Sequence, residues 1–196
     1  YDVTIIDTQL YSNVEDKRAK YITLDIRNPL DYHFKDKDVL VHLAGQVGDP
    51  LCNLNIPESI SVNIAGTTNI CEMAKKCGGK RIIHISSWSV YGARPDVIFT
   101  EEETEYYPVD LYGMEKLAQE KIVESYFKDF TMFRLGTVFG MSPSQRFDLV
   151  INKFIARAFN GEEIMVLGGS QNRPFVHVKD VSRAITHAIK NNLCGV

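Results

Sequence analysis

Tyr112 and Lys116 stand four residues apart in a segment whose pattern predicts a helix. Both side chains therefore lie on one helix face, about 6 Å apart along the axis. A free tyrosine has a pKa of about 10, and bringing it near 7 needs about 4 kcal/mol of preference for the phenolate. One ammonium at about 6 Å supplies about 2.8 kcal/mol at an effective dielectric constant of about 20. An oxidised nicotinamide nearby could supply the rest. A tyrosine made acidic by both charges can accept a proton from a substrate hydroxyl while hydride leaves the same carbon.

Ser87 ends a predicted strand in a segment rich in serine, Ser86-Ser87-Trp88-Ser89. Its hydroxyl could hydrogen-bond the same substrate oxygen. The pattern Tyr-x-x-x-Lys is a weak signal by itself, because any helix surface can carry it by chance. A serine-rich strand end 25 residues upstream of the tyrosine favours the catalytic interpretation.

Asp7 and Asp25 each follow a short apolar run. In a dinucleotide-binding fold, an acid at the end of the second strand accepts hydrogen bonds from the adenosine ribose and repels a 2′-phosphate. A second acid at a strand end could bind the adenine amino group. From these residues alone, a turn or a helix cap is the more frequent role of either aspartate.

The run Val41-His42-Leu43-Ala44-Gly45-Gln46 ends in small residues, which would let a cofactor come close to the backbone. A lone histidine in such a run is expected to be a satisfied core residue, and we assign His42 no proton transfer.

Short apolar runs alternate with amphipathic stretches along the first part of the chain. Strands covered on both faces are predicted at residues 2–6, 21–24, 39–43, 81–85 and 130–135. Helices are predicted at 58–77, which stops at Gly78-Gly79, and at 110–127. This order predicts an α/β fold, a Rossmann-like doubly wound parallel sheet with helices on both faces.

The predicted helix 110–127 has one broad apolar face, and its polar residues are expected outside. The apolar face contains Leu111, Met114, Leu117, Ile122 and Tyr126, and the expected outer residues are Glu115, Gln119, Lys121 and Glu124.

After Gly140 the pattern changes to a smaller lobe that is interwoven with the sheet. A helix is predicted at 148–160, strands at 164–167 and 175–178, and a last helix at 181–191 capped by Asp180. We therefore divide the chain into a dinucleotide-binding domain, residues 1–140, and part of a substrate lobe, residues 141–196. Both ends look cut, and we expect a first strand with a glycine-rich loop before Tyr1 and more of the lobe after Val196.

Composition excludes several classes of protein. The 196 residues are 44% hydrophobic and 24% charged with a net charge of −3, which is typical of a globular protein. We expect no nucleic-acid partner, because no basic stripe is present, and no membrane span, because the apolar runs are short. The four cysteines show no metal-ligand spacing and predict reduced thiols in a cytoplasmic protein.

Taken together, the motifs resemble those of extended short-chain dehydrogenases/reductases of the NAD-dependent epimerase/dehydratase family, the nucleotide-sugar enzymes. The resemblance covers almost the whole chain in family order: VTIID, LDIR, VHLAG, VNIAGTTNICEMAKKCGGKRIIHISS, SVYG, YGMEK, FRLGTVFG and RPFVHVKDV. Each motif alone is unspecific, but the set is highly specific.

The resemblance implies a role for each matching residue, with NAD as cofactor, a nucleotide-diphosphate sugar as substrate and no metal. Ser87, Tyr112 and Lys116 match the catalytic set, with Lys116 also binding the nicotinamide ribose. The cofactor-binding positions are Asp7, Asp25, Ile26, Leu43, Ala44, Gly45, Gln46, Asn63, Tyr112 and Lys116. The substrate-binding positions are Ser87, Ser89, Thr137, Asn152 and Arg173.

Two departures from the family pattern bear on the reaction. Thr137 puts a short hydroxyl where many members carry an amide against the substrate phosphate. Trp88 and Ser89 occupy the positions of the Asp-Glu pair of sugar 4,6-dehydratases, and neither can act as a carboxyl acid or base. Dehydration and decarboxylation are therefore disfavoured.

We predict an NAD-dependent nucleotide-sugar epimerase acting at C4 by transient oxidation. One alternative is a dehydrogenase or reductase of a sugar or another hydroxyl substrate, which the same residues would serve. Another is a non-catalytic NAD-binding sensor or interaction subunit. Relatives pack the helices matching 58–77 and 110–127 into a two-fold dimer interface, so we expect a homodimer.

Overall fold

The computed structural model describes residues 1–10, 16–93, 97, 99–103, 105–166, 169 and 172–196. Its strands are β1 (Thr4–Asp7), β2 (Lys20–Thr23), β3 (Leu40–His42), β4 (Arg81–Ser87), β5 (Asp129–Leu135), β6 (Thr137–Phe139) and β7 (Phe175–His177). Its α-helices are α1 (Asp31–Phe34), α2 (Asp49–Leu54), α3 (Ile56–Ile60), α4 (Thr67–Lys76), α5 (Leu111–Tyr126), α6 (Val150–Phe159) and α7 (Val178–Asn191). A π-helical segment, η1 (Ser61–Gly66), joins α3 to α4, and a short 3₁₀ turn, η2 (Trp88–Tyr91), follows β4.

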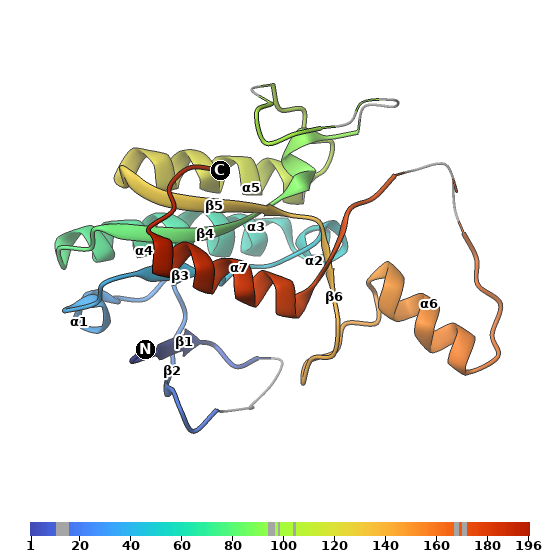
Figure 1. Ribbon diagram of the computed structural model, residues 1–196, viewed down its shortest axis with the longest axis horizontal. Coiled ribbons are helices and arrows are strands. Elements are labelled where there is room, and N and C mark those ends of the chain that lie inside the picture. Colours follow the sequence, from blue (N-terminus) through green and yellow to red (C-terminus); the bar gives the residue numbers. More distant parts are fainter. Residues whose placement is uncertain (11–15, 94–96, 98, 104, 167–168, 170–171) are drawn as a thin grey trace.

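All paired strands run parallel. β3, β4 and β5 form the central sheet in that order, β1 pairs with β2, and β6 pairs with β7. α4 and α5 lie along one side of the central sheet, and α7 lies along the other (Figure 1). The predicted Rossmann-like α/β fold is confirmed. The prediction of strands covered on both faces is correct for β4 and wrong for β1 and β2, neither of which contains a buried residue.

The core lies between β4, β5 and the two helices on their shared side. Buried apolar side chains from α4, α5 and both strands pack together there: Cys71, Ala74, Ile82, Val123, Phe127 and Met132. α4 ends as predicted, because Gly78 adopts φ +80°, a conformation that a side chain disfavours, and Gly79 N donates to Ala74 O at 2.7 Å.

The helix predicted at 58–77 is one continuous run that begins earlier and changes winding. Asn55 caps its start by accepting a hydrogen bond from Glu58 N at 3.2 Å, and η1 interrupts the α-helical pattern before α4. Segments wound in this way are frequent at functional sites. The sequence pattern did not predict the change in winding.

α5 lies within one residue of its predicted bounds but has a different buried face. Glu115 and Gln119, expected outside, are 3% and 0% exposed, whereas Met114, expected inside, is 52% exposed. The prediction failed because both polar side chains are hydrogen-bonded to η1. The pattern of apolar residues along the sequence contains no information on such hydrogen bonds. Lys121 and Glu124 do lie outside, in an exposed ion pair at 2.8 Å.

The C-terminal part differs from the prediction in two places. Residues 164–166 form no strand and are exposed, and Leu167 lies outside the described residues. α7 begins at Val178, and its cap is His177, whose Nδ1 accepts from Lys179 N at 3.1 Å. Asp180, the predicted cap, lies inside the first turn and pairs with Arg183.

The chain leaves the central sheet after β5 and returns to it at the end. α6 stands apart from the sheet (Figure 1), and none of its side chains is buried. The last residues come back to β5, where Gly195 N donates to Phe130 O at 2.9 Å. This path leaves the carboxyl end of β5 on the side of β6 and α6 (Figure 1).

Candidate active site

α5 brings Tyr112 and Lys116 together. Asp110 starts the helix by accepting from Gly113 N at 2.7 Å, which places Tyr112 in the first turn. Lys116 Nζ lies 5.9 Å from the centre of the Tyr112 ring and donates to Ile85 O of β4 at 2.9 Å. Lys116 is 4% exposed, so its ammonium is held in the protein interior at this end of the sheet.

Ser87 ends β4 and meets the tyrosine there. Its Oγ accepts from Ser89 N at 3.2 Å, which caps η2, and lies 3.1 Å from Ser89 Oγ. The Ser87 hydroxyl also lies close enough to Tyr112 to lower the pKa of the phenol. The three predicted catalytic side chains are therefore together, at the carboxyl end of the central strand.

The protonation of this group differs from the expectation. Burial raises the pKa of Tyr112 to about 12, and the nearby Ser87 hydroxyl offsets this only in part. Burial also lowers the pKa of Lys116 to about 8. The expected lowering of the phenol pKa by Lys116 is therefore not seen in the protein without NAD, because burial disfavours the phenolate more strongly. The further contribution expected from an oxidised nicotinamide stays a prediction.

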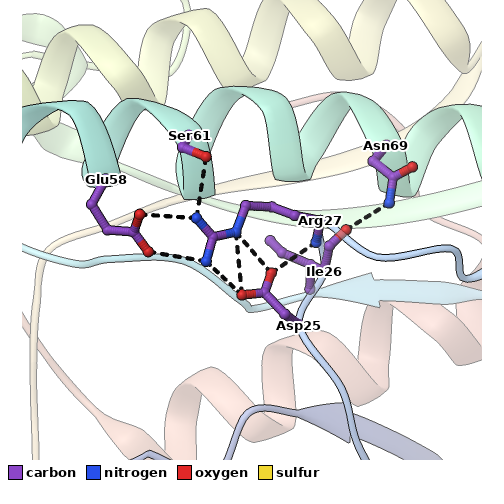
Figure 2. Close-up of polar contacts among 6 residues, drawn as sticks. All are labelled: Asp25, Ile26, Arg27, Glu58, Ser61 and Asn69. Carbon is purple, nitrogen blue, oxygen red and sulfur yellow. Dashed lines mark hydrogen bonds and ion pairs between the residues drawn. The ribbon is translucent and has the colours of Figure 1, made fainter.

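Asp7 and Asp25 lie at the ends of β1 and just after β2. Asp7 is exposed and accepts from Gln9 N at 2.6 Å. Asp25 is held by Arg27, whose Nη2 donates to Asp25 Oδ2 at 2.7 Å. Figure 2 shows that the same guanidinium also contacts Glu58 and Ser61 of the helix above it.

The loop after β2 is fixed from one side by Asn69 and by the contacts of Arg27 with Asp25, Glu58 and Ser61, which we call the Arg27 clamp. Asn69 Nδ2 donates to Ile26 O at 2.7 Å (Figure 2), and Ile26 is itself buried. Sequence reasoning singled out Asp25 and Ile26 but missed Arg27, Glu58 and Asn69. The alternation of an acid and a base in Asp25-Ile26-Arg27 was the available signal.

The loop after β3 is held by Asn63. Leu43 is exposed, Ala44, Gly45 and Gln46 are half-buried, and Asn63 is buried in η1. Asn63 Oδ1 accepts from Gln46 N at 2.9 Å, and its Nδ2 donates to Gln46 O at 3.0 Å. The predicted cofactor loop and its asparagine are thus in direct contact.

His42 is a core residue, as expected. Its Nε2 lies 3.0 Å from Thr67 Oγ1, and burial lowers its pKa to about 3. His84 lies beside it, with ring centres 5.2 Å apart, and burial lowers its pKa well below the ordinary value. Both imidazoles are therefore neutral, and among the described contacts neither hydrogen-bonds Ser87, Tyr112 or Lys116.

The predicted substrate residues beyond the sheet are dispersed. Thr137 begins β6, where its N–H donates to Pro174 O at 2.9 Å. Asn152 lies on α6 and donates to Arg146 O at 2.8 Å, and Arg173 is exposed just before β7. Arg146, which the sequence reasoning did not single out, donates to Val47 O at 2.7 Å and so joins this part to the loop that follows Gln46.

Comparison with known protein families matches residues 1–195 to the description "NAD dependent epimerase/dehydratase family". The chain belongs to this family. It is 28% identical over 199 residues to UDP-glucuronate 4-epimerase of Thermodesulfobacterium geofontis, covering 97% of this chain and 61% of that protein. The chain also covers 56% and 59% of two other curated relatives, so it spans somewhat under two thirds of such proteins.

Solved structures agree with this assignment. UDP-N-acetylglucosamine 4-epimerase from Methanobrevibacter ruminantium M1, in complex with UDP-N-acetylmuramic acid, is 28% identical with a TM-score of 0.86 and covers 100% of this chain and 67% of that one. UDP-glucuronic acid 4-epimerase from Bacillus cereus, in complex with UDP-glucuronic acid and NAD, is 27% identical with a TM-score of 0.80 and covers 92% and 59%.

Three further observations concern the part of the chain that the structure describes. No helix there is both long and apolar enough to cross a membrane. No group of three or more His, Cys, Asp or Glu side chains there could hold a metal ion. No disulfide joins the cysteines Cys52, Cys71, Cys77 and Cys194.

Proposed function

We propose that this chain forms the catalytic core of an NAD-dependent nucleotide-sugar epimerase that acts at C4 through transient oxidation. The observation that carries the proposal is the meeting of Ser87, Tyr112 and Lys116 at the carboxyl end of β4. Open parallel sheets bind their ligands at that edge. The three 4-epimerases compared above support the position of the reaction on the sugar.

The residues present fit NAD. Lys116 Nζ has three N–H groups and donates one hydrogen bond within the described part of the chain, to Ile85 O, so two remain for a ribose diol. A side chain at Gly45 would come within 2.7 Å of Asn63 Oδ1, so a glycine is needed for the loop to pack against Asn63. We assign Asp7 to the adenosine ribose, Asp25 and Ile26 to adenine, and Leu43, Ala44, Gly45, Gln46 and Asn63 to the path between the two riboses.

Bound NAD would supply a hydride acceptor that returns the hydride to the opposite face of the same carbon. Tyr112 accepts the proton of the C4 hydroxyl, and Ser87 donates a hydrogen bond to that oxygen. In the second half of the reaction Tyr112 gives the proton back, so protons and electrons balance over the cycle. Lys116 holds a positive charge near pH 7, since its pKa is about 8.

The high pKa of Tyr112 makes the base depend on further positive charge. Moving a pKa from about 12 to about 7 takes roughly 7 kcal/mol of preference for the phenolate. A single positive charge at about 6 Å supplies about 2.8 kcal/mol. The tyrosine is therefore protonated in the free protein, and the proposal places its activation in the complex with the oxidised coenzyme.

On the sugar side we assign Ser89, Thr137, Asn152 and Arg173 to the nucleotide-diphosphate sugar. The guanidinium of Arg173 can grip phosphate oxygens at two points, and its exposure leaves it accessible to a ligand. We also propose residues 1–140 as the NAD-binding domain and 141–196 as part of the substrate lobe.

A homodimer is the proposed assembly. Ile56 and Ile60 on α3 and Met114 on α5 are exposed apolar side chains on the helices that relatives place at a dimer interface. Light scattering at the mass of two chains would support this assembly, and a monomer mass across micromolar concentrations would reject it.

The test of the function is incubation of the full-length protein with a panel of UDP-sugars. An epimerase converts each accepted sugar to its C4 epimer without net change in absorbance at 340 nm. Stoichiometric accumulation of NADH would reject epimerisation in favour of a net dehydrogenase. Tyr112→Phe is expected to abolish turnover, and a variant that keeps its full biological activity would instead indicate a non-catalytic NAD-binding role.

A further inference from the structure

Asn63 lies where the predicted cofactor loop, η1 and the catalytic helix meet. It is 1% exposed, and both ends of its side-chain amide hold the backbone of Gln46. Its Oδ1 is so close to Gly45 that a Cβ there would lie 2.7 Å away. The orientation of this one amide therefore sets the path of the loop.

Glu115 holds the amide from the other side. It lies on α5 directly before Lys116, is 3% exposed, and accepts from Asn63 Nδ2 at 2.6 Å and from Ser59 Oγ at 2.8 Å. Its Oε1 has no hydrogen-bond partner among the described residues. Burying a carboxylate in this way costs stability, so packing alone does not explain why a glutamate occupies this position.

Glu115 can instead be explained by the shape of the Asn63 amide, whose oxygen and NH₂ group could exchange places by a rotation of 180°. Turned by 180°, Asn63 would point an oxygen at Glu115 and an NH₂ group at Gln46 N–H. A carboxylate only accepts hydrogen bonds, so Glu115 permits the orientation that holds Gln46 and opposes the other.

We propose that Glu115 is a positioning residue that fixes the Asn63 amide and through it the loop at Gly45 and Gln46. The inference rests on the proposed function, in which this loop lines NAD. Because Glu115 lies between Tyr112 and Lys116 in α5, the contact also ties the cofactor loop to the helix that carries the base.

Gln119 provides a matched control one turn further along α5. It is 0% exposed, and its Nε2 donates to Asn63 O at 2.8 Å and to Thr67 Oγ1 at 3.0 Å. It thus shares the helix, the burial and the partner residue with Glu115. It contacts the Asn63 backbone, however, and leaves the side-chain amide alone.

The experiment compares Glu115→Ala, Glu115→Gln and Gln119→Ala in the full-length protein. The dissociation constant for NAD is measured by calorimetry on cofactor-free protein, and the unfolding temperature is measured on the same samples. Glu115→Ala is expected to weaken NAD binding by about tenfold or more, the effect of losing about 1.4 kcal/mol of loop order. Glu115→Gln keeps an acceptor for Asn63 and is expected to bind within about threefold of the wild type.

Gln119→Ala is expected to lower the unfolding temperature as much as Glu115→Ala while leaving the affinity for NAD unchanged. Equal weakening of NAD binding by both alanine variants would overturn the proposal, as would unchanged binding by Glu115→Ala. Glu115→Met, which keeps the volume and removes the acceptor, replaces the alanine variant if that one does not fold. Wild-type protein that binds no NAD would refute the proposed function itself, whereas failure of the variants alone leaves it standing.

Discussion

Glu120 and Arg134 form a buried ion pair behind the catalytic group. Arg134 Nη2 lies 2.7 Å from Glu120 Oε2, with side chains 3% and 0% exposed. Arg134 also donates to the hydroxyls of Tyr91 at 3.1 Å and Tyr106 at 3.0 Å, and Glu120 accepts from Ser86 of β4. The pair thus joins α5, β4, β5 and η2 directly beside Ser87.

Arg134→Met keeps most of the side-chain volume and leaves the Glu120 carboxylate buried without a cation. Removing one partner of a buried pair costs about 3–5 kcal/mol. With an unfolding entropy of about 2.1 cal/mol/K per residue, the 196 residues give about 0.4 kcal/mol/K. The predicted loss in unfolding temperature is therefore about 7–12 °C, measurable by differential scanning calorimetry.

The control is the double variant Arg134→Met with Glu120→Leu, which also removes the buried carboxylate that the single variant leaves without a cation. It is expected to unfold at a higher temperature than Arg134→Met alone, because the desolvation cost of the carboxylate disappears. A loss below about 2 °C in the single variant, or a double variant less stable than the single one, would show that the buried Glu120 carboxylate does not depend on Arg134.

Three further outcomes follow from the same contacts. Lys116→Met should raise stability at pH 7 by about 2 kcal/mol. Burial lowers the pKa of Lys116 from 10.5 to about 8, so keeping it charged in the folded protein at pH 7 costs about 3 kcal/mol, and losing its hydrogen bond to Ile85 O takes back about 1 kcal/mol. Urea unfolding should show the gain fading as the pH rises from about 8 toward 10.5, where the lysine of the wild type loses its proton in the folded protein first. Arg27→Ala should cost under about 1 kcal/mol of stability, since the clamp is partly exposed, yet weaken NAD binding about fivefold by freeing Asp25; equal affinity by calorimetry would contradict this. Arg81→Met removes the donors to Ala188 O, Leu193 O and Asn192 Oδ1, should cost about 2–3 kcal/mol, and should speed hydrogen exchange at the end of α7; unchanged exchange there would contradict it.

Much of the fold could be predicted because the apolar runs are long enough to fix element type. β5 begins one residue before its predicted start, and α5 lies one residue inside each predicted end. The short runs of the C-terminal part carried less information, since three or four apolar residues do not distinguish a strand from an exposed loop. Residues 164–166 show this, as an apolar run without a neighbouring strand.

The proximity of Tyr112 and Lys116 could be predicted because their spacing along one helix sets their geometry. Tyr112 and Lys116 are placed together by helix periodicity alone, whereas their pKa values depend on burial, which the sequence does not give. Glu115 and Gln119 were misplaced for the same physical reason. Their partners in η1 lie more than 50 positions away in the chain. The polarity of the two side chains therefore predicted exposure to solvent, whereas in the folded protein both are buried and hydrogen-bonded.

The central claim is that hydride leaves C4 and returns to it within one active site, with Tyr112 moving the proton. The most direct measurement uses a UDP-sugar carrying deuterium at C4, incubated with the full-length protein in ordinary water. If hydride leaves and returns in this way, the C4-epimerised product retains the deuterium at C4, and Tyr112→Phe gives no product. Product that has exchanged the label for solvent hydrogen would contradict it.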